Sequence, residues 1–376
     1  MKIALVYGGK SGEHEISLVS AAAVARNIAP EHEIFPIAIT KSGRWFLQSN
    51  DELEKVKSDN KAHFKIEEDD SKEVLPVPAG GTERTFKIGN DFFGVDIVFP
   101  VLHGTFGEDG TIQGLFEMVD VPYVGCGVCA SAITMDKEKT KSLLAQAGIP
   151  VVPGLCMRRS DLADWQRYDE FLENAQNELG FPLFVKPCSA GSSDGASLAK
   201  DLQHLNGAIM EAFLWDDKIL IEKAIDAREI ECSVTGNPTT DDGSADFEAT
   251  TAYGPGEIAP KHDFYDYDAK YNDPNGAELL IPANLVEEKL QEIRTIAKRA
   301  YTALDLSGLS RVDFFIDRKD GTLYLNEINS MPGFTQISMF PKMCEKFNLN
   351  FQDLTTLLMN EALKRFKKTR ELCTSR

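Results

Sequence analysis

Two short runs of β-branched and aromatic residues near the end of the chain constrain its fold more than any other feature. They cover residues 311–317 (RVDFFID) and 322–329 (TLYLNEIN), and Lys319, Asp320 and Gly321 lie between them. Runs of this kind, joined by a short segment that ends in glycine, are typical of a β-hairpin. The sequence therefore predicts two antiparallel strands in this region.

Alternation of side chains along these two strands predicts a polar face on the hairpin. In the second strand, strict alternation puts Leu323, Leu325, Glu327 and Asn329 on one face, and pairing brings Asp313 close to the last two. Two carboxylates and an amide oxygen suit Mg²⁺ and the phosphate oxygens that accompany it. A solvated polar face is the alternative. The small, turn-forming residues that follow Asn329 favour a site.

Composition limits the classes of function that this chain can have. It has 376 residues, of which 43% are hydrophobic and 26% charged, as expected for a globular protein with two or three domains. A formal net charge of −19 argues against a nucleic-acid surface, which needs a basic footprint. The seven scattered cysteines form no zinc motif, and no apolar run approaches the ~18 residues of a membrane span. We expect reduced thiols, a cytoplasmic location and no contact with a membrane.

The N-terminus predicts an open parallel α/β domain. A strand over residues 2–7 enters GGKSGEHEIS (residues 8–17), and a helical apolar spacing follows. Helix N-terminal amides that point into such a turn can bind phosphate. The segment lacks the full spacing of a P-loop, so a tight turn between strand and helix is the preferred interpretation. Glu13 then needs another role, structural or catalytic.

A second buried strand, residues 95–102, ends in HGTFGEDG, beginning at His103. Open α/β sheets bind ligands at the carboxyl ends of their strands, which makes His103 a candidate site residue. A structural histidine is the alternative. Residues 41–90 are polar and irregular and predict a peripheral insertion with short strands.

The middle of the chain carries features of nucleotide binding. Lys186 ends a strand that leads into the small residues of CSAGSSDG, an arrangement whose amides and ammonium group can hold phosphates. Lys137 opens a helix that Asp136 can cap. Residues 254–282 have no apolar period but contain several aromatic residues, which favours an ordered lid over disorder.

The order of these segments and their residues resemble the ATP-grasp superfamily and, within it, the D-alanine–D-alanine ligase family. The matching segments span nearly the whole chain: GGKSGEHEIS, LHGTFGEDGTIQG, MDKEKTK, VKPCSAGSSDG, LIEKAI, FYDYDAKY, GLSRVDFFID and LNEINSMPGFTQISMFPKM. The resemblance implies a three-domain α/β and α+β architecture, in which an open parallel α/β domain precedes two α+β domains that sandwich ATP. We expect these domains at residues 1–135, 136–225 and 226–376, with the lid at about residues 254–282.

The resemblance also implies a role for each matched residue. Residues expected to bind ATP and its phosphates are Lys137, Lys186, Ser192, Ser193, Glu222, Lys223, Ile225, Glu229, Lys270, Asn326 and Glu327. Two Mg²⁺ ions, with Mn²⁺ as an alternative, would be bound by Asp313, Glu327 and Asn329. Residues expected to bind the two amino acids are Glu13, Ser17, His103, Arg311, Asn329, Gly333, Ser338 and Met339. A catalytic role is implied for Glu13, Ser192, Lys270, Tyr271, Arg311 and Gly333.

The implied reaction is ATP-dependent ligation of two D-alanines through a D-alanyl phosphate, for peptidoglycan synthesis. The expected partners are therefore D-alanine, ATP and a second copy of the chain that binds through the N-terminal domain. A ligase that uses D-serine or D-lactate as its second substrate is one alternative, although Tyr271 and Met339 favour D-alanine. Another ATP-grasp carboxylate–amine ligase and a silent nucleotide-binding module are further alternatives. Asp194 departs from the family pattern, in which an apolar residue often follows the serine pair.

Overall fold

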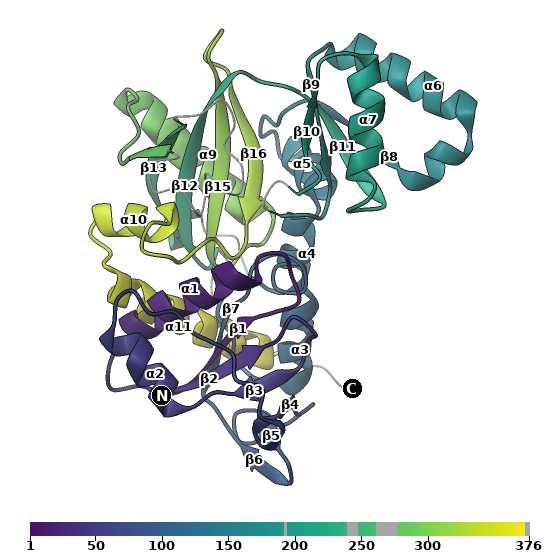
Figure 1. Ribbon diagram of the computed structural model, residues 1–376. Helices are drawn as coiled ribbons and strands as arrows, with labels where there is room; N and C mark the ends of the chain where they lie inside the picture. Colours follow the sequence, from purple (N-terminus) through teal and green to yellow (C-terminus); the bar gives the residue numbers. More distant parts are fainter. Residues whose placement is uncertain (192–193, 239–246, 261–276, 373–376) are drawn as a thin grey trace.

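The computed structural model describes residues 1–191, 194–238, 247–260 and 277–372. Its N-terminal part is a four-stranded sheet in the order β3-β2-β1-β7 (Figure 1). Strands β1 and β2 pair in parallel, β1 and β7 do the same, and β3 is antiparallel to β2. The bounds of these strands are β1 Lys2–Gly8, β2 Glu33–Ile39, β3 Trp45–Leu47 and β7 Ile97–Val101. The open parallel sheet predicted for the N-terminus is therefore present, with one antiparallel edge strand.

Helices and a small second sheet complete this part of the molecule. The helices are α1 His14–Asn27, α2 Asn50–Ser58, α3 Thr111–Val119 and α4 Val128–Met135. The predicted insertion, residues 41–90, contains β3, α2, β4 Val74–Pro76 and β5 Phe86–Ile88. Strand β6, Asp91–Phe93, follows directly and completes a three-stranded antiparallel sheet with β4 and β5. This small sheet projects from the lower edge of the molecule in Figure 1, away from the other two large sheets.

The central part is an antiparallel sheet in the order β10-β9-β11-β8. Its strands are β8 Gly154–Arg158, β9 Leu183–Pro187, β10 Ser197–Ala199 and β11 Lys218–Lys223. Helices α6 Trp165–Asn174 and α7 Leu202–Ala212 pack against it through a separate apolar core. Helix α5, Lys137–Gln146, leads into this part, and its N-terminus is capped as predicted, because the Asp136 side chain accepts from the Lys139 amide.

The C-terminal part is a five-stranded antiparallel sheet in the order β14-β13-β12-β15-β16. Its strands are β12 Ala227–Gly236, β13 Thr250–Pro260, β14 Ala277–Leu280, β15 Gly308–Asp317 and β16 Leu323–Asn329. Helix α9, Glu287–Ala303, covers one face with an apolar stripe that is buried in the core of this sheet. Helices α10 Met339–Lys346 and α11 Phe351–Arg370 end the described chain.

The predicted hairpin is confirmed as β15 and β16, but strict alternation along β16 is wrong. Asp313 pairs with Glu327 whereas Phe314 pairs with Leu325, so Asn326 is an extra residue in the ladder. Such a β-bulge switches the face to which the following side chains point. As a result Leu323 and Leu325 lie in the core, while Glu327 and Asn329 lie on the opposite face of the sheet with Asp313.

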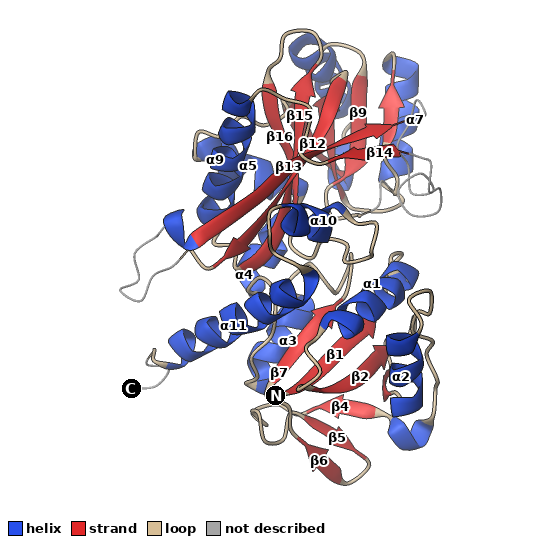
Figure 2. Cartoon of the chain, turned by 90° about the vertical axis from the view of Figure 1, so that its left-hand side faces the viewer, coloured by secondary structure: helices blue, strands red, loops and turns tan. Residues whose placement is uncertain are grey.

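The C-terminal helix returns to the N-terminal sheet. Leu354, Leu358 and Met359 of α11 are buried in the same apolar core as residues of β1, β7 and α1. The Thr355 hydroxyl donates to the Asn27 carbonyl at 2.8 Å. Figure 2 shows α11 beside α1. The first and last parts of the chain therefore share one core.

Helix α9 begins without a side-chain cap. It starts at Glu287 with Val286 as its N-cap and makes no side-chain cap bond. The nearby Asn284 carbonyl accepts from the Arg228 guanidinium at 2.9 Å. None of the described helices combines the length and the apolar character that crossing a membrane would require.

Candidate active site

The central and C-terminal sheets meet at Lys186. Lys186 lies near the end of β9, and its ammonium group is 3.3 Å from Oδ1 of Asn326 on β16. Asn326 is the bulged residue, so the extra residue in β16 allows both Asn326 and Glu327 to face the central sheet. This contact brings the predicted phosphate ligand next to the predicted metal face.

A buried ionic cluster surrounds Lys186. Glu222, on β11, forms ion pairs with Lys186 (2.5 Å) and with Lys141 of α5. Burial opposes ionisation of Glu222, but the two lysines outweigh it and lower its pKa. Burial would likewise lower the pKa of Lys186, yet the carboxylates of Glu222 and Glu327 raise it. Lys186 therefore remains a cation at neutral pH.

The loop of small residues after β9 is fixed at its base by α5. The Lys137 ammonium donates to the Ala190 carbonyl at 2.7 Å, and the Lys137 amide donates to the Cys188 carbonyl at 3.0 Å. Gly191 is close to Glu13, because a Cβ built there would lie 3.0 Å from a carboxylate oxygen of Glu13. The predicted phosphate loop thus reaches the first glycine-rich turn of the chain.

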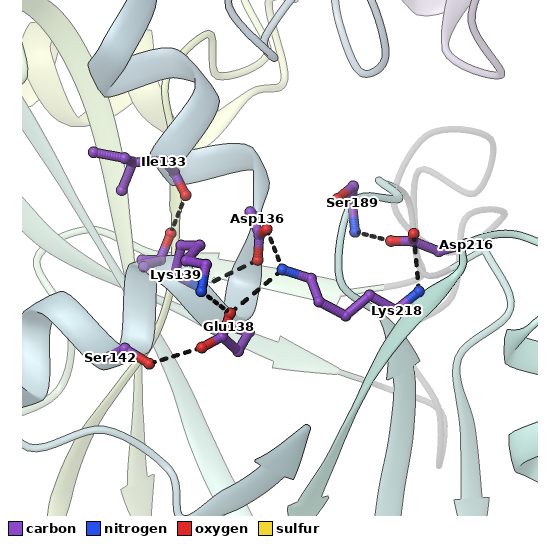
Figure 3. A network of polar contacts seen from close by, with 9 residues as sticks. Ile133, Asp136, Glu138, Lys139, Ser142, Ser189, Asp216 and Lys218 are labelled. Atoms are coloured by element: carbon purple, nitrogen blue, oxygen red, sulfur yellow. Dashed lines mark hydrogen bonds and ion pairs between the residues drawn. The ribbon is translucent and has the colours of Figure 1, made fainter. Parts of the chain in front are cut away.

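A polar network at the start of β11 supports the same loop (Figure 3). Lys218 forms ion pairs with Asp136 and Glu138 at the N-terminus of α5. Asp216 accepts from the Ser189 amide at 2.7 Å and from the Lys218 amide at 3.2 Å. These contacts join α5, β11 and the loop into one rigid frame.

The predicted metal face is occupied by an arginine. Arg311 donates to both oxygens of Asp313, at 2.7 and 2.6 Å, and lies 3.1 Å from Glu231. The Asn329 side-chain amide also donates to Asp313, at 2.9 Å. Carboxylate and amide oxygens are the donors that Mg²⁺ prefers, so the residue types fit. Within the described ranges, however, no three His, Cys, Asp or Glu side chains are already gathered into a metal site.

The first glycine-rich turn and the HGTFGEDG segment lie together at the carboxyl ends of β1 and β7. Ser17 is fully buried; its hydroxyl accepts from the Gly8 amide and donates to the Val101 carbonyl. His103 is buried between Ser20 and the Met331 carbonyl, each 3.0 Å from a ring nitrogen. Burial lowers the pKa of His103. Ser17 and His103 therefore already have structural partners.

Glu108 links this region to the loop after β16. Its two oxygens accept from the amides of Gly104 (2.8 Å) and Met331 (2.9 Å). Burial and the nearby Glu13 raise the pKa of Glu108 to about 8. Glu108 therefore bonds the amide of Met331 and His103 bonds its carbonyl, two residues before Gly333.

The predicted second-substrate residues lie in and after this loop. The Ser338 hydroxyl is 2.7 Å from that of Thr335 and accepts from the Thr335 amide at 3.0 Å. Gly333 lies against it, since a Cβ there would be 2.8 Å from the Ser338 hydroxyl. Met339 is only 4% exposed and packs in an apolar cluster with Ile258 and Met343. Its side chain is thus part of the core beneath the loop.

The remaining predicted residues fall into two groups. Glu222, Lys223 and Ile225 lie at the end of β11 and in the following turn, and Glu229 lies on β12, so these four mark the connection between the two sheets. Ser192, Ser193, Lys270 and Tyr271 lie outside the described residues. Asp194 lies near Gly12, and burial and Glu13 raise its pKa.

Sequence reasoning missed Lys141, Glu231 and Lys218. Lys141 is four residues after Lys137, a spacing that puts both on one helix face, and this signal could have identified it. Glu231 alternates with Glu229 along β12 and pairs with Asp313. Nothing in the sequence near Lys218 indicates that it reaches α5, because that contact depends on how the sheet packs.

The fold, with its two α+β parts and an open α/β domain, places the protein in the ATP-grasp class. Family models for the D-ala D-ala ligase N-terminus and the D-ala D-ala ligase C-terminus match residues 2–126 and 143–360. The chain belongs to the D-alanine–D-alanine ligase family.

Individual relatives agree with this assignment. A D-alanine–D-alanine ligase of Treponema denticola is 52% identical over 376 residues, which is the full length of both chains. The solved D-alanine–D-alanine ligase of Coxiella burnetii has a TM-score of 0.81 and 32% identity, covering 99% of this chain and 96% of that one. The VanG D-Ala:D-Ser ligase of Enterococcus faecalis has a TM-score of 0.79 and 33% identity, covering 96% and 99%.

Proposed function

We propose that this protein joins two molecules of D-alanine into D-alanyl-D-alanine at the expense of ATP, for peptidoglycan precursors. Similarity over the full length to ligases of this name supports the proposal. The structural observation that carries it is the contact between Lys186 and Asn326, because it brings a buried, charged lysine beside the acidic face of β15 and β16. Phosphoryl transfer mainly requires such positioning and charge neutralisation.

The reaction needs ATP because a carboxylate is a poor electrophile. A carboxylate oxygen of the first D-alanine attacks the γ-phosphorus, ADP leaves, and an acyl phosphate forms. The deprotonated amine of the second D-alanine then attacks the carbonyl carbon, and phosphate leaves with the electron pair of the broken carbon–oxygen bond. The tetrahedral intermediate carries a negative oxygen that fixed hydrogen-bond donors can stabilise.

The chain offers a group for each of these tasks. We assign Lys137 and Lys186 to the phosphates, the β11–β12 connection to the nucleoside, and Glu13 to the ammonium group of the first D-alanine. Arg311 and the backbone near Gly333 would stabilise the oxyanion. In this structure the bidentate contact with Asp313, through Nε and Nη2, orients the Arg311 guanidinium.

Magnesium would be held by Asp313, Glu327 and Asn329, whose oxygen donors fit a hard divalent cation. Such a cation supplies charge neutralisation for the phosphate oxygens. Mn²⁺ has the same preference for oxygen ligands and is a possible substitute.

We further propose a cytoplasmic homodimer formed through the N-terminal domain, and the domain boundaries given above. The closeness of the C-terminal helix to the N-terminal sheet means that the first domain also includes α11 in its packing.

The test is D-alanine-dependent release of phosphate from ATP, with the product identified by mass. We expect release only when D-alanine, ATP and Mg²⁺ are all present, and a product with the mass of the D-alanine dipeptide. Competition with D-serine and D-lactate at neutral pH should still give mainly that dipeptide. Absence of phosphate release would refute the ligase function, and a product dominated by D-serine or D-lactate would refute the choice of second substrate.

A further inference from the structure

Lys141 is a buried lysine in the ionic cluster that surrounds Lys186 and Glu222. It lies on α5, one helical turn after Lys137, and is only 6% exposed. Its ammonium group forms an ion pair with Glu222, whose other carboxylate oxygen is bound by Lys186. Glu222 is itself only 2% exposed. Two cations therefore share one carboxylate in a place that water hardly reaches.

The charge balance of this cluster decides whether Lys186 can bind a phosphate. A lone buried pair of Glu222 and Lys186 would be neutral, and moving Lys186 towards a phosphate would leave Glu222 as an unpaired buried anion. Removing one partner from a buried ion pair is strongly unfavourable. With Lys141 present, Glu222 keeps a partner when Lys186 turns to its ligand.

The two lysines differ in how firmly they hold their protons. Burial, together with the positive charge of Lys186, lowers the pKa of Lys141 to about 8, although Glu222 opposes the shift. The pKa of Lys186 is raised because Glu222 and Glu327 outweigh its burial. Lys186 also reaches across the cleft to Asn326 at 3.3 Å, whereas the ion pair of Lys141 lies within the central part.

We propose that Lys141 is a positioning residue for ATP: it neutralises Glu222 and so leaves the charge of Lys186 available to the nucleotide phosphates. Lys141 itself does not touch the nucleotide in this arrangement. The inference rests on the proposed function, since it assigns the phosphates of ATP to Lys186. It predicts that loss of Lys141 weakens ATP binding, because Glu222 then keeps Lys186 as its only nearby cationic partner in this cluster.

A double-mutant cycle on Lys141 and Glu222 tests this inference by calorimetric measurement of ATP affinity, without turnover. We expect Lys141→Met to weaken ATP binding by about tenfold or more, because Lys186 must then neutralise Glu222 alone and can no longer turn to a phosphate without leaving Glu222 unpaired. In a Glu222→Gln background, where the carboxylate charge is gone, Lys141→Met should weaken ATP binding by less than about threefold. The exposed Lys139 on the same helix gives a matched control, and Lys139→Met should leave the affinity unchanged.

Steady-state kinetics add a second readout. In Lys141→Met the KM for ATP should rise while the KM for D-alanine stays within about twofold, since the lesion is confined to the nucleotide end. Equal losses of ATP affinity in both backgrounds, or unchanged affinity in Lys141→Met, would overturn the inference. If Lys141→Met does not fold, Lys141→Gln, which keeps a hydrogen-bond donor but no charge, is expected to give the same pattern. Wild-type protein that binds ATP but releases no phosphate with D-alanine would refute the ligase function and leave this cycle valid.

Discussion

Lys186 joins the central and C-terminal sheets of this ligase-family protein through charged and polar contacts. It combines an ion pair to Glu222 with a contact to Asn326. A lysine that is buried but kept charged by two carboxylates is well suited to a polyanion, because its ammonium is already stripped of most water. Its position also makes it sensitive to substitution.

Lys186→Ala should weaken ATP binding by about tenfold to a hundredfold, since a hydrogen bond to a charged group contributes roughly 1.5–3 kcal/mol. Calorimetric titration with ATP measures the effect. Lys200→Ala, at an exposed position just after β10, is the control and should bind ATP normally. Wild-type affinity in the Lys186 variant would contradict the assignment of this lysine to the phosphates.

Glu108 gives the protein a pH-dependent stability. Its folded-state pKa of about 8 lies above the ordinary value of 4.5. The folded state therefore binds its proton more tightly than the unfolded state, and the stabilisation present at acidic pH is lost as the pH rises through 8. In Glu108→Gln the free energy of unfolding should fall less between about pH 5 and pH 8 than in the wild type.

Urea denaturation at several pH values across this window measures that difference. Glu211→Gln, at an exposed position on α7, should keep the wild-type dependence. An identical slope in the Glu108 variant and the wild type would show that this carboxyl does not titrate in the window.

Among the secondary-structure elements, α11 belongs to the core of the N-terminal part although it lies at the end of the chain. It packs on the N-terminal sheet and α1, so it connects the last residues of the chain to the first domain. The bulge in β16 is equally consequential, because one extra residue turns Asn326 and Glu327 towards the cleft.

Leu358→Ala in α11 should lower the free energy of unfolding by about 2–5 kcal/mol, the usual cost of a cavity in a packed core. Leu358 is fully buried in the core shared with β1 and β7. Chemical denaturation is the measurement, and Lys367→Ala, at an exposed position near the end of the same helix, is the control. A loss below 1 kcal/mol would mean that α11 contributes little to the stability of this core.

At the scale of the whole molecule, the proposed activity brings together the central sheet, the C-terminal sheet and the N-terminal part. The contacts of His103 and Glu108 with Met331 fix the N-terminal part against the loop after β16. The acidic face opposite Lys186 has oxygen donors, and the Arg311 guanidinium is bound to one of its carboxylates, that of Asp313.

Removal of divalent ions should therefore abolish D-alanine-dependent phosphate release, and added Mg²⁺ should restore it. The reason is that Asp313 and Glu327 cannot both face phosphate oxygens without a cation between them. Phosphate release measured in a chelator, with and without excess Mg²⁺, tests this. Asp313→Asn should raise the Mg²⁺ concentration needed for half-maximal release, and unchanged Mg²⁺ dependence would argue against Asp313 as a ligand.

Much of the fold follows from local patterns in the sequence. The apolar runs and the glycine turn specify β1 and the hairpin, and the polar side chain of Asp136 specifies the start of α5. These features depend on neighbours within a few residues, which is why periodicity and capping rules predict them. The sequence segments also place the chain in its family, since they match from the first strand to α10.

Only the tertiary structure decided which charged groups meet. Lys141 forms an ion pair with Glu222, which is 81 residues away in the sequence. The Arg311 side chain is bound to Asp313. The single-residue bulge at Asn326 overturned strict alternation, and packing buried Met339 beneath its loop. Burial and ion pairing depend on elements that are distant in the chain, and their energies depend on the low local polarity that packing creates. The sequence alone determined the strands and motifs, and packing determined the electrostatics of the site.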